Sequence, residues 1–462
     1  MERNSSSFRD EGGYVFTHQG TVYRHIDISF QEQYDFFLSS GLYETLTSKG
    51  LLIGHQEVDL KQFDVIPGLN NRVIRPEQVG FISFPFEWSF NQLKDAALAT
   101  LEIQRLAIPR GMILKDASAF NIQFVDGKPC LIDTLSFIQI GAEIKPWAAY
   151  KQFCEQFLVP LALMSYVDGR LNLLLRSFLD GVPIDLGSDL LPFRSYFSLT
   201  LFMHVHLHSR FHRKYASRGA GKGKAVRTVS INSLLGLTES LTTAVLRLKP
   251  PKKTTPWAAY YKDSSDEEYR RTKREIVETA ITAVKPRLVW DIGANNGEFS
   301  RLFSEKQIEV ISLDGDTGCV DENYRIARGG KDSHIHPLFL NIADPSPGLG
   351  WANEERHSFL RRSEPDLIVA FAVVHHLAIS QNISFDLIAN LWSGLAGHLL
   401  IEFLEKDDPR VAELLSFKER RHDEYSAANF EEAFGRHYQT LGQYPTGTGT
   451  RVIYLMKSLK KK

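Results

Sequence analysis

The spacing of hydrophobic residues changes several times along the first part of the chain. Residues 13–28 alternate around Gly20, which predicts a β-hairpin with this glycine in the turn. Apolar positions at helical spacing predict a helix over 31–52, and the short apolar run 79–84 predicts a strand. A second amphipathic helix is predicted to begin after Ser89, whose hydroxyl suits an N-cap. This mixture indicates an α+β N-terminal region.

Helical patterns continue over 147–209 and then give way to a basic, glycine-rich stretch. Lys, Arg and Gly are frequent from 210 to 229, which is typical of a solvated linker; an arm that binds polyanions is the alternative. One further helix is predicted for 230–248. We therefore expect an N-terminal α+β domain at 1–209, and a basic linker with one helix at 210–252.

From residue 253 to the end, segments of strand length alternate with amphipathic helices. The predicted strands are 288–291, 309–314, 335–340, 366–372, 398–404, 438–441 and 451–456. Strands that alternate with helices are typical of a parallel sheet whose faces are covered by helices. The fold class predicted for 253–462 is therefore α/β.

Composition narrows the class of protein. The 462 residues, 43% of them hydrophobic, are enough for more than one core, and the net charge of −1 creates no overall field toward nucleic acid. The three cysteines form no C-x-x-C pair, which favours a reducing compartment. No apolar run is long enough to span a bilayer, and the N-terminus lacks a signal peptide's apolar core. We expect a cytoplasmic protein without a membrane span or a specific nucleic-acid partner; the sequence does not indicate its oligomeric state.

The most informative stretch joins a buried strand to a helix through a turn of Gly and Asn. Asp291 lies in the strand, and Gly293 and Gly297 allow the backbone to turn tightly and to approach a ligand. Asn295 tolerates the left-handed backbone angles that such a turn requires. A strand that delivers such a turn to a helix N-terminus is typical of nucleotide-like ligand sites. The spacing D-x-G-x-x-x-G differs from the dinucleotide fingerprint G-x-G-x-x-G.

Polar residues also follow the next strands. Asp314 ends the second strand, where a carboxylate can accept both hydroxyls of a ribose, and Asn341 and Asp344 follow the third. Together with the glycine turn, this pattern resembles class I S-adenosylmethionine (SAM)-dependent methyltransferases. The resemblance implies a Rossmann-like seven-stranded sheet, with SAM as the cofactor. It implies as cofactor-binding residues Asp291, Gly293, Asn295, Gly297, Asp314 and Ala370, with Asn341 or Asp344 contacting the adenine amine.

The fourth strand leads into the sequence Val373-Val-His375-His376-Leu. This resembles the h-h-H-H-L motif of class I methyltransferases that act on small molecules or carbohydrates, and it makes His375 and His376 the catalytic candidates. One imidazole would take a proton from a hydroxyl acceptor; lining the acceptor pocket is the alternative. A metal site is not expected, because no Cys or carboxylate accompanies the histidines of helix 204–212.

The N-terminal region contains a second pattern, in which Asp116 and Asn121 are followed by two short strands and Asp133. It resembles a protein-kinase catalytic loop, which implies Asp116 as the base and Asn121 and Asp133 as Mg²⁺ ligands. Leu114 stands where kinases have His, no Gly-rich phosphate loop precedes it, and Arg24 is a poor substitute for the strand lysine. We interpret the segment as structural or degenerate, with a nucleotide- or sugar-binding remnant and an active phosphotransferase as alternatives.

The whole chain resembles bacterial two-part methyltransferases related to nodulation-type proteins. We expect methyl transfer from SAM to a small molecule, a saccharide or a lipid-linked glycan that the N-terminal domain recognises. The motifs of base-amino, cytosine-C5 and ribose methylases are not apparent. The alternatives are a bifunctional protein with a phosphotransferase-like N-terminal domain, and a non-catalytic SAM-binding sensor or assembly protein.

Overall fold

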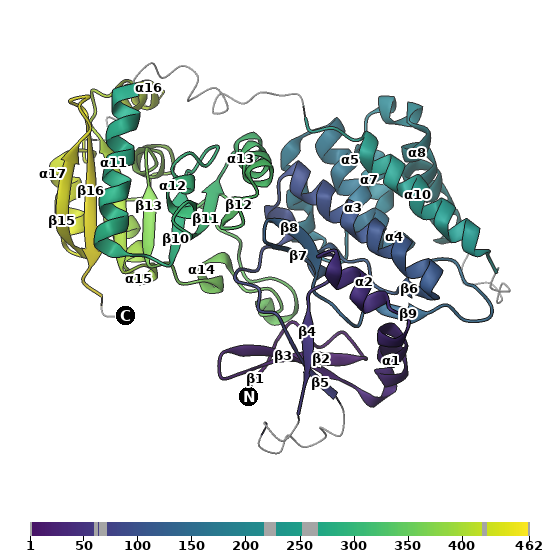
Figure 1. Cartoon of the computed structure of the whole chain (residues 1–462). Helices are drawn as coiled ribbons and strands as arrows, with labels where there is room; N and C mark the ends of the chain where they lie inside the picture. The colour runs from purple at the N-terminus through teal and green to yellow at the C-terminus, as the bar shows by residue number, and fades with distance from the viewer. Residues whose placement is uncertain are drawn as a thin grey trace. The chain divides into compact units, whose positions relative to one another are not determined.

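The computed structural model divides the chain into two compact units (Figure 1). The first unit contains 1–252 and 348–357, and the second contains 253–347 and 358–462. The residues that the structure describes are 2–59, 63, 72–216, 228–251, 267–417 and 423–460. Much of the predicted basic linker and the predicted start of the second domain at 253 lie outside them.

A five-stranded antiparallel sheet in the order β1-β2-β3-β5-β4 opens the first unit. Its strands are β1 (Glu2–Arg3), β2 (Gly13–His18), β3 (Thr21–Ile26), β4 (His55–Val58) and β5 (Arg72–Pro76). The hairpin predicted around Gly20 is confirmed, and this glycine has a left-handed φ of 77°. The single helix predicted over 31–52 is wrong. Two helices, α1 (Gln31–Ser39) and α2 (Leu42–Ser48), replace it because Gly41 adopts a φ of 71°, which ends helical geometry.

The strand predicted at 79–84 is also wrong. The side-chain amide of Gln123 accepts a hydrogen bond from the Ser83 N–H (2.9 Å) and donates one to the Ser83 carbonyl (3.0 Å). A side chain thereby satisfies the backbone groups that a neighbouring strand would otherwise pair. The helix predicted after Ser89 is confirmed as α3 (Phe90–Ala107), and Ser89 and Gln92 form a capping box at its start.

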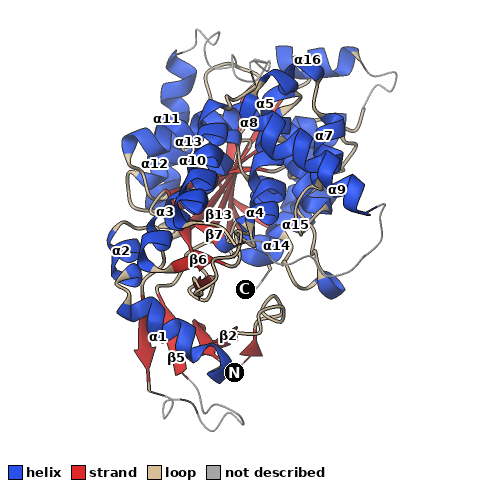
Figure 2. Ribbon diagram, turned by 90° about the vertical axis from the view of Figure 1, so that its right-hand side faces the viewer, coloured by secondary structure: helices blue, strands red, loops and turns tan. Residues whose placement is uncertain are grey.

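Two short antiparallel strand pairs and a group of helices follow in the first unit (Figure 2). The pairs are β6 (Met112–Leu114) with β9 (Phe137–Gln139), and β7 (Ile122–Val125) with β8 (Lys128–Leu131). The helices are α4 (Tyr150–Phe153), α5 (Val159–Tyr166), α6 (Leu174–Ser177), α7 (Ile184–Leu190), α8 (Leu199–Leu201), α9 (His208–Ala216) and α10 (Ile231–Arg247). The helices expected over 147–209 and 230–248 are therefore confirmed.

Two histidines of the segment 204–212 are buried in the first unit. His204 bonds the hydroxyl groups of Tyr150 and Ser240, at 2.9 and 2.8 Å. His206 is fully buried between the hydroxyls of Ser188 and Ser195. Hydroxyl partners therefore satisfy these ring nitrogens inside the helical core.

The second unit is built on a seven-stranded sheet in the order β12-β11-β10-β13-β14-β16-β15. Its strands are β10 (Leu288–Ile292), β11 (Glu309–Asp314), β12 (Ile335–Phe339), β13 (Leu367–Ala370), β14 (His398–Leu404), β15 (Tyr438–Pro445) and β16 (Arg451–Ser458). The first five are parallel, and β16 pairs antiparallel with both β14 and β15. This confirms the predicted α/β fold with a Rossmann-like seven-stranded sheet.

Helices with apolar faces accompany this sheet. They are α11 (Glu267–Val284), α12 (Ser300–Ser304), α13 (Thr317–Gly330), α14 (Phe359–Arg362), α15 (Phe385–Leu395), α16 (Pro409–Ser416) and α17 (Ala427–Gly435). One core cluster joins Val277 of α11, Phe303 of α12 and the central strand residues Val289 and Val369. Apolar burial therefore contributes to the packing of α11 on the sheet.

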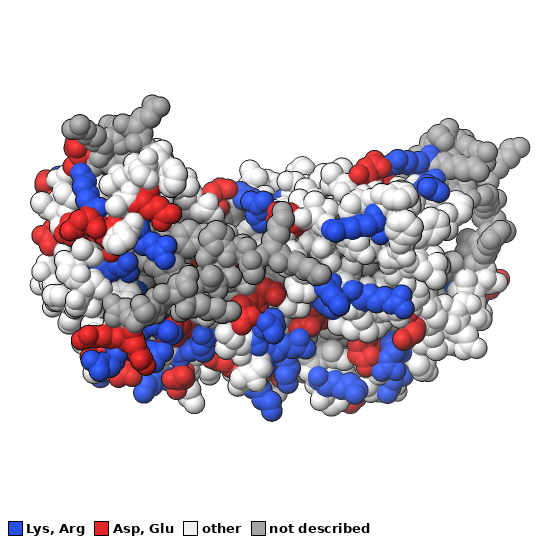
Figure 3. Space-filling view, turned by 90° about the horizontal axis from the view of Figure 1, so that it is seen from above, with Lys and Arg blue, Asp and Glu red and all other residues white. Residues whose placement is uncertain are grey.

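Charge is mixed over the surface that Figure 3 presents, where Lys and Arg side chains stand among Asp and Glu. This agrees with the net charge of −1. Within the described residues, no helix is long and apolar enough to cross a membrane.

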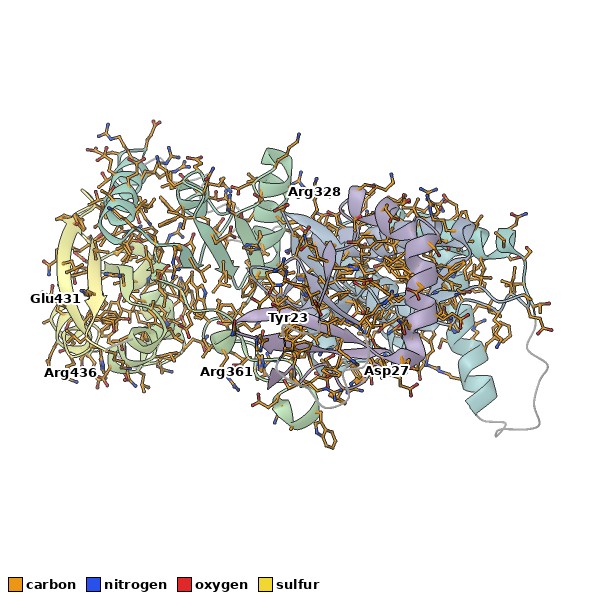
Figure 4. All side chains as sticks on the ribbon, turned by 60° about the horizontal axis from the view of Figure 1, so that its bottom comes forward. Tyr23, Asp27, Arg328, Arg361, Glu431 and Arg436 are labelled. Atoms are coloured by element: carbon orange, nitrogen blue, oxygen red, sulfur yellow. The ribbon has the colours of Figure 1, made fainter. Side chains whose placement is uncertain are left out.

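Residues 348–357 leave the second unit between β12 and β13 and form part of the first. Glu355 is buried and accepts two hydrogen bonds from the Arg9 guanidinium, both 3.0 Å long. The Arg356 guanidinium lies 4.6 Å from the centre of the Phe120 ring. The chain returns to the second unit at α14, whose Arg361 is labelled in Figure 4. A loop of the second half is thus held by specific contacts in the first unit.

Candidate functional site

The carboxyl ends of the parallel strands meet at one edge of the seven-stranded sheet. The Gly293 N–H donates to the Leu313 carbonyl (2.8 Å), and the Leu340 N–H donates to the Asp314 carbonyl (2.9 Å). Strand β13 pairs with β10 up to Ala370. The segments that follow four strands are therefore brought together where ligands bind in open α/β sheets.

The glycine turn requires its glycines for two separate reasons. Gly293 and Gly297 have φ of 74° and 77°, in the left-handed region. A Cβ on Gly293 would lie 2.5 Å from a methyl carbon of Val373, and one on Gly297 would lie 2.1 Å from the Asn323 Oδ1. Asn295 also has a positive φ of 52°, as expected for an asparagine in this turn.

Two carboxylates hold this turn in place. The Asp314 Oδ2 accepts a hydrogen bond from the Asn295 N–H and its Oδ1 accepts one from the Asp316 N–H, both 2.8 Å. Burial raises the pKa of Asp314 to about 6. Asp291 lies deeper and accepts a hydrogen bond from the Ser300 hydroxyl (2.6 Å), and burial raises its pKa to about 6 as well. Asp291 thus braces the turn from inside, while Asp314 is only half-buried.

The remaining predicted cofactor residues differ in exposure. Asn341 and Asp344 are exposed after β12, where the Asn341 Oδ1 accepts a hydrogen bond from the Ala343 N–H (3.0 Å). Ala370 is fully buried at the end of β13, between Ile292 and Ile401 of the flanking strands. Polar side chains are therefore available at the β12 end of the edge, while Ala370 is a packing position.

The two predicted catalytic histidines are adjacent, with ring centres 4.3 Å apart. His375 is 1% exposed, and its Nδ1 has no hydrogen-bond partner. Burial, then the neighbouring His376 and Arg451, lowers the pKa of His375 well below its ordinary value. Burial also lowers the pKa of His376. Both imidazoles are consequently neutral at pH 7, and the lowered pKa makes each a weaker base than an ordinary histidine.

A buried polar network beside this edge is missed by the sequence analysis. Glu402 of β14, 0% exposed, accepts hydrogen bonds from the Tyr269 hydroxyl and the Lys273 ammonium of α11. The Tyr269 hydroxyl in turn accepts from Lys273 (3.1 Å) and from Arg451 of β16 (2.9 Å). Arg451 also pairs with Asp408 at 2.6 Å. The i,i+4 spacing of Tyr269 and Lys273 is the only sequence signal for this cluster, since its other members come from distant strands.

The same helix also contacts the glycine turn itself. Glu298, which follows Gly297, accepts hydrogen bonds from Arg270 at 3.1 and 2.6 Å and from Arg274 at 2.7 Å. The Lys273 ammonium lies 5.0 Å from the centre of the Phe299 ring. Helix α11 therefore binds both the turn and the end of β14.

The kinase-like residues lie together in the first unit. Burial, and then the neighbouring Asp133 carboxylate, raises the pKa of Asp116. Asn121 ends a short 3-10 helix, and its carbonyl accepts a hydrogen bond from the Ile132 N–H (2.8 Å). Arg24 of β3 pairs with Asp133 at 2.8 Å and with a second carboxylate, Asp10, at 2.6 Å. A cation of this chain therefore already occupies one side of Asp133, and a magnesium role for these residues stays a prediction.

The strand order and the glycine turn at the carboxyl edge define the second unit as a class I methyltransferase fold. The chain belongs to the family of the nodulation protein NoeA: it is 30% identical to NoeA of Rhizobium meliloti (strain 1021) over 459 residues, which cover 98% of this chain and 95% of the relative. No protein-family model matches the chain.

Solved structures also resemble parts of the chain. The bifunctional kinase-methyltransferase WbdD matches with a TM-score of 0.30 and 16% identity, over 41% of this chain and 39% of that one. The N-methyltransferase NodS from Bradyrhizobium japonicum WM9 matches with a TM-score of 0.31 and 12% identity, over 42% and 99%. Magnesium protoporphyrin IX methyltransferase from Synechocystis PCC 6803, with bound SAH, matches with a TM-score of 0.31 and 16% identity, over 42% and 88%. The matched region spans about two fifths of the WbdD chain.

Proposed function

We propose that this chain transfers a methyl group from SAM to a small-molecule, saccharide or lipid-linked glycan acceptor. The observation that carries the proposal is the turn at the ends of β10 and β11, where Asp314 fixes the Asn295 N–H beside two left-handed glycines. When bound, SAM supplies an activated methyl group on its sulfonium. The chain has to bind the cofactor, align the acceptor and exclude water.

The residues present fit this cofactor. Each Asp314 oxygen accepts one backbone hydrogen bond in the structure, so each keeps a lone pair for a ribose hydroxyl. The exposed Asn341 and Asp344 supply polar groups where an adenine amine would lie. The buried Asn296 Oδ1 in the turn lacks a hydrogen-bond partner, so a polar acceptor remains available there.

Within this proposal, one of the paired histidines receives the acceptor's proton. The pKa of His375 is lowered well below its usual value, chiefly by burial, so its ring is neutral, and its Nδ1 is unpartnered. Its unpartnered nitrogen at the end of a central strand can accept a hydrogen bond from an acceptor hydroxyl, and its lowered pKa confines proton transfer to the stage at which methyl transfer makes that hydroxyl acidic. The N-terminal unit would then recognise that acceptor.

Calorimetric titration of SAM into the full chain tests the cofactor assignment. We expect Asp314→Ala to lose about 10- to 100-fold in affinity, because charge-assisted hydrogen bonds contribute about 1.5–3 kcal/mol. Glu322→Gln, a change on the exposed part of α13, is the matched control and should bind SAM normally. Equal affinity in Asp314→Ala and the control would contradict the proposal.

Incubation with methyl-labelled SAM and fractionated cell extract tests the reaction. Transfer of label to a carbohydrate-containing fraction supports the proposed acceptor class. Tight SAM binding without transfer to any fraction supports the non-catalytic sensor. A thermal shift with ATP and Mg²⁺ that is lost in Asp133→Ala would support the phosphotransferase alternative.

A further inference from the structure

Large apolar side chains are exposed in one short part of the first unit. Soluble proteins rarely expose contiguous apolar patches without a binding role. These side chains, which we call the apolar patch, are Leu190 (46% exposed), Phe193 (75%), Phe197 (79%), Leu199 (66%), Met203 (38%) and Phe211 (50%). Six such residues within 22 positions form a concentration that needs a physical explanation.

The elements that carry the patch pack against one another. Leu190 ends α7, Phe193 and Phe197 belong to the 3-10 helix Phe193–Phe197, and the other members lie on the continuous helical segment 199–216. The rings of Phe193 and Phe197 contact edge to face, with centres 5.4 Å apart. Helices α7 and α9 are neighbours, as Figure 2 also shows. Beneath them, His206 ties α7 to the 3-10 helix through Ser188 and Ser195. The patch therefore rests on a fixed scaffold.

Basic residues predominate around the patch, although the exposed Asp189 of α7 lies directly before Leu190. Residues 190–229 contain eight Lys or Arg and no Asp or Glu, although the whole chain has a net charge of −1. Among the described residues, Arg194 and Arg210 are basic members of this stretch, and Arg213 pairs with Asp189 of α7. The Arg210 guanidinium lies 6.0 Å from the centre of the Tyr196 ring. Exposed aromatic side chains with a basic rim are complementary to an apolar layer that lies under anionic groups.

We propose that the apolar patch rests on the surface of an anionic lipid bilayer. Phe193 and Phe197 would enter the boundary between headgroups and acyl chains, and Arg194 and Arg210 would contact lipid phosphates. A second copy of this chain is a poorer occupant, because a two-fold interface would bring the two basic rims together. The net charge of the whole chain, −1, does not attract it to an anionic membrane, so the proposed binding depends on the aromatic residues of the patch and the basic residues around it. The inference is independent of the proposed methyl transfer.

Vesicle co-sedimentation of the full chain tests this proposal. Wild type should bind vesicles of phosphatidylglycerol and phosphatidylcholine at least about fivefold more strongly than vesicles of phosphatidylcholine alone. The double variant Phe193→Ser/Phe197→Ser should lose at least about tenfold in partitioning. Arg194→Gln/Arg210→Gln should remove most of the preference for the anionic vesicles. Phe417→Ser, at an 80% exposed aromatic residue of the second unit, is the matched control and should bind as wild type does.

Three outcomes would overturn the proposal. They are wild-type binding that ignores lipid charge, an unchanged Phe193→Ser/Phe197→Ser variant, and a dimer in light scattering that this variant abolishes. Calorimetric SAM titration of each variant serves as a separate readout. Variants that bind SAM as wild type does but no longer bind vesicles support the lipid surface, whatever becomes of the methyl-transfer proposal.

Discussion

At the scale of single residues, the glycine turn shows how local backbone geometry and long-range packing act at the same positions. Gly297 combines a left-handed φ with direct contact to Asn323 of α13. Asn323 itself donates a hydrogen bond to the Ser312 hydroxyl of β11 (2.7 Å). A side chain at Gly297 would therefore disturb the turn and the neighbouring strand together.

Gly297→Ala is expected to lower the free energy of unfolding by about 2 kcal/mol or more, because the left-handed conformation alone costs about 1–2 kcal/mol for a residue with a Cβ. SAM affinity should fall at least about tenfold as the turn moves, since a factor of ten corresponds to about 1.4 kcal/mol. Urea unfolding and calorimetry measure the two effects. Gly329→Ala is the control, because a Cβ there meets no atom within 4 Å. A Gly297→Ala protein that matches this control would contradict the account.

At the scale of elements, α11 is more than a cover for the sheet. One row of its side chains, Tyr269 and Lys273, enters the buried network around Glu402, and the adjacent row, Arg270 and Arg274, binds Glu298 of the glycine turn. The Lys273–Glu402 pair is almost completely buried. Burial shields both charges from water, so each is stabilised mainly by its partner. Moving α11 would leave both charges buried and unpaired, and the pair therefore fixes the position of the helix on the sheet.

Lys273→Met should destabilise the full chain by about 3–5 kcal/mol, because it leaves the Glu402 carboxylate buried and unpaired. The double variant Lys273→Met/Glu402→Gln should recover a large part of that loss, since the amide keeps an acceptor for the Tyr269 hydroxyl. Urea unfolding of both variants provides the measurement. Arg271→Met, at the exposed pair with Glu275, is the control and should change stability by less than about 1 kcal/mol. A double variant less stable than Lys273→Met would refute the explanation.

At the scale of the whole molecule, the chain passes between its two compact units three times, after residues 252, 347 and 357. The segment Gly348–His357 is fixed in the first unit by Glu355, which also accepts a hydrogen bond from the Trp351 N–H (3.1 Å). Burial opposes ionisation of Glu355, but the hydrogen bonds from Arg9 and Trp351 leave its pKa below the ordinary value. The connection between β12 and β13 is thus anchored by a charged side chain.

Glu355→Ala should release this segment from the first unit. Amide hydrogen exchange of residues 348–357 is expected to accelerate at least about tenfold. Without Glu355, the segment can open locally without breaking an ion pair to Arg9. The strands of the seven-stranded sheet should exchange as in wild type. Glu354→Ala changes a half-exposed neighbour and should leave exchange nearly unaltered. Unchanged protection in Glu355→Ala would show that other contacts hold the segment.

The sequence by itself determined the elements of the α/β half, the glycine turn and the position of Asp314, because strand periodicity, turn chemistry and strand order along the chain are local properties. It also located the hairpin at Gly20 and the cap at Ser89. Tertiary structure alone decided that 79–84 is no strand, since Gln123 replaces a strand partner. It also decided that Lys273 meets Glu402, and that residues 348–357 belong to the first unit. In each of these cases the stabilising partner lies tens to hundreds of positions away, and only the folded chain brings the two groups together.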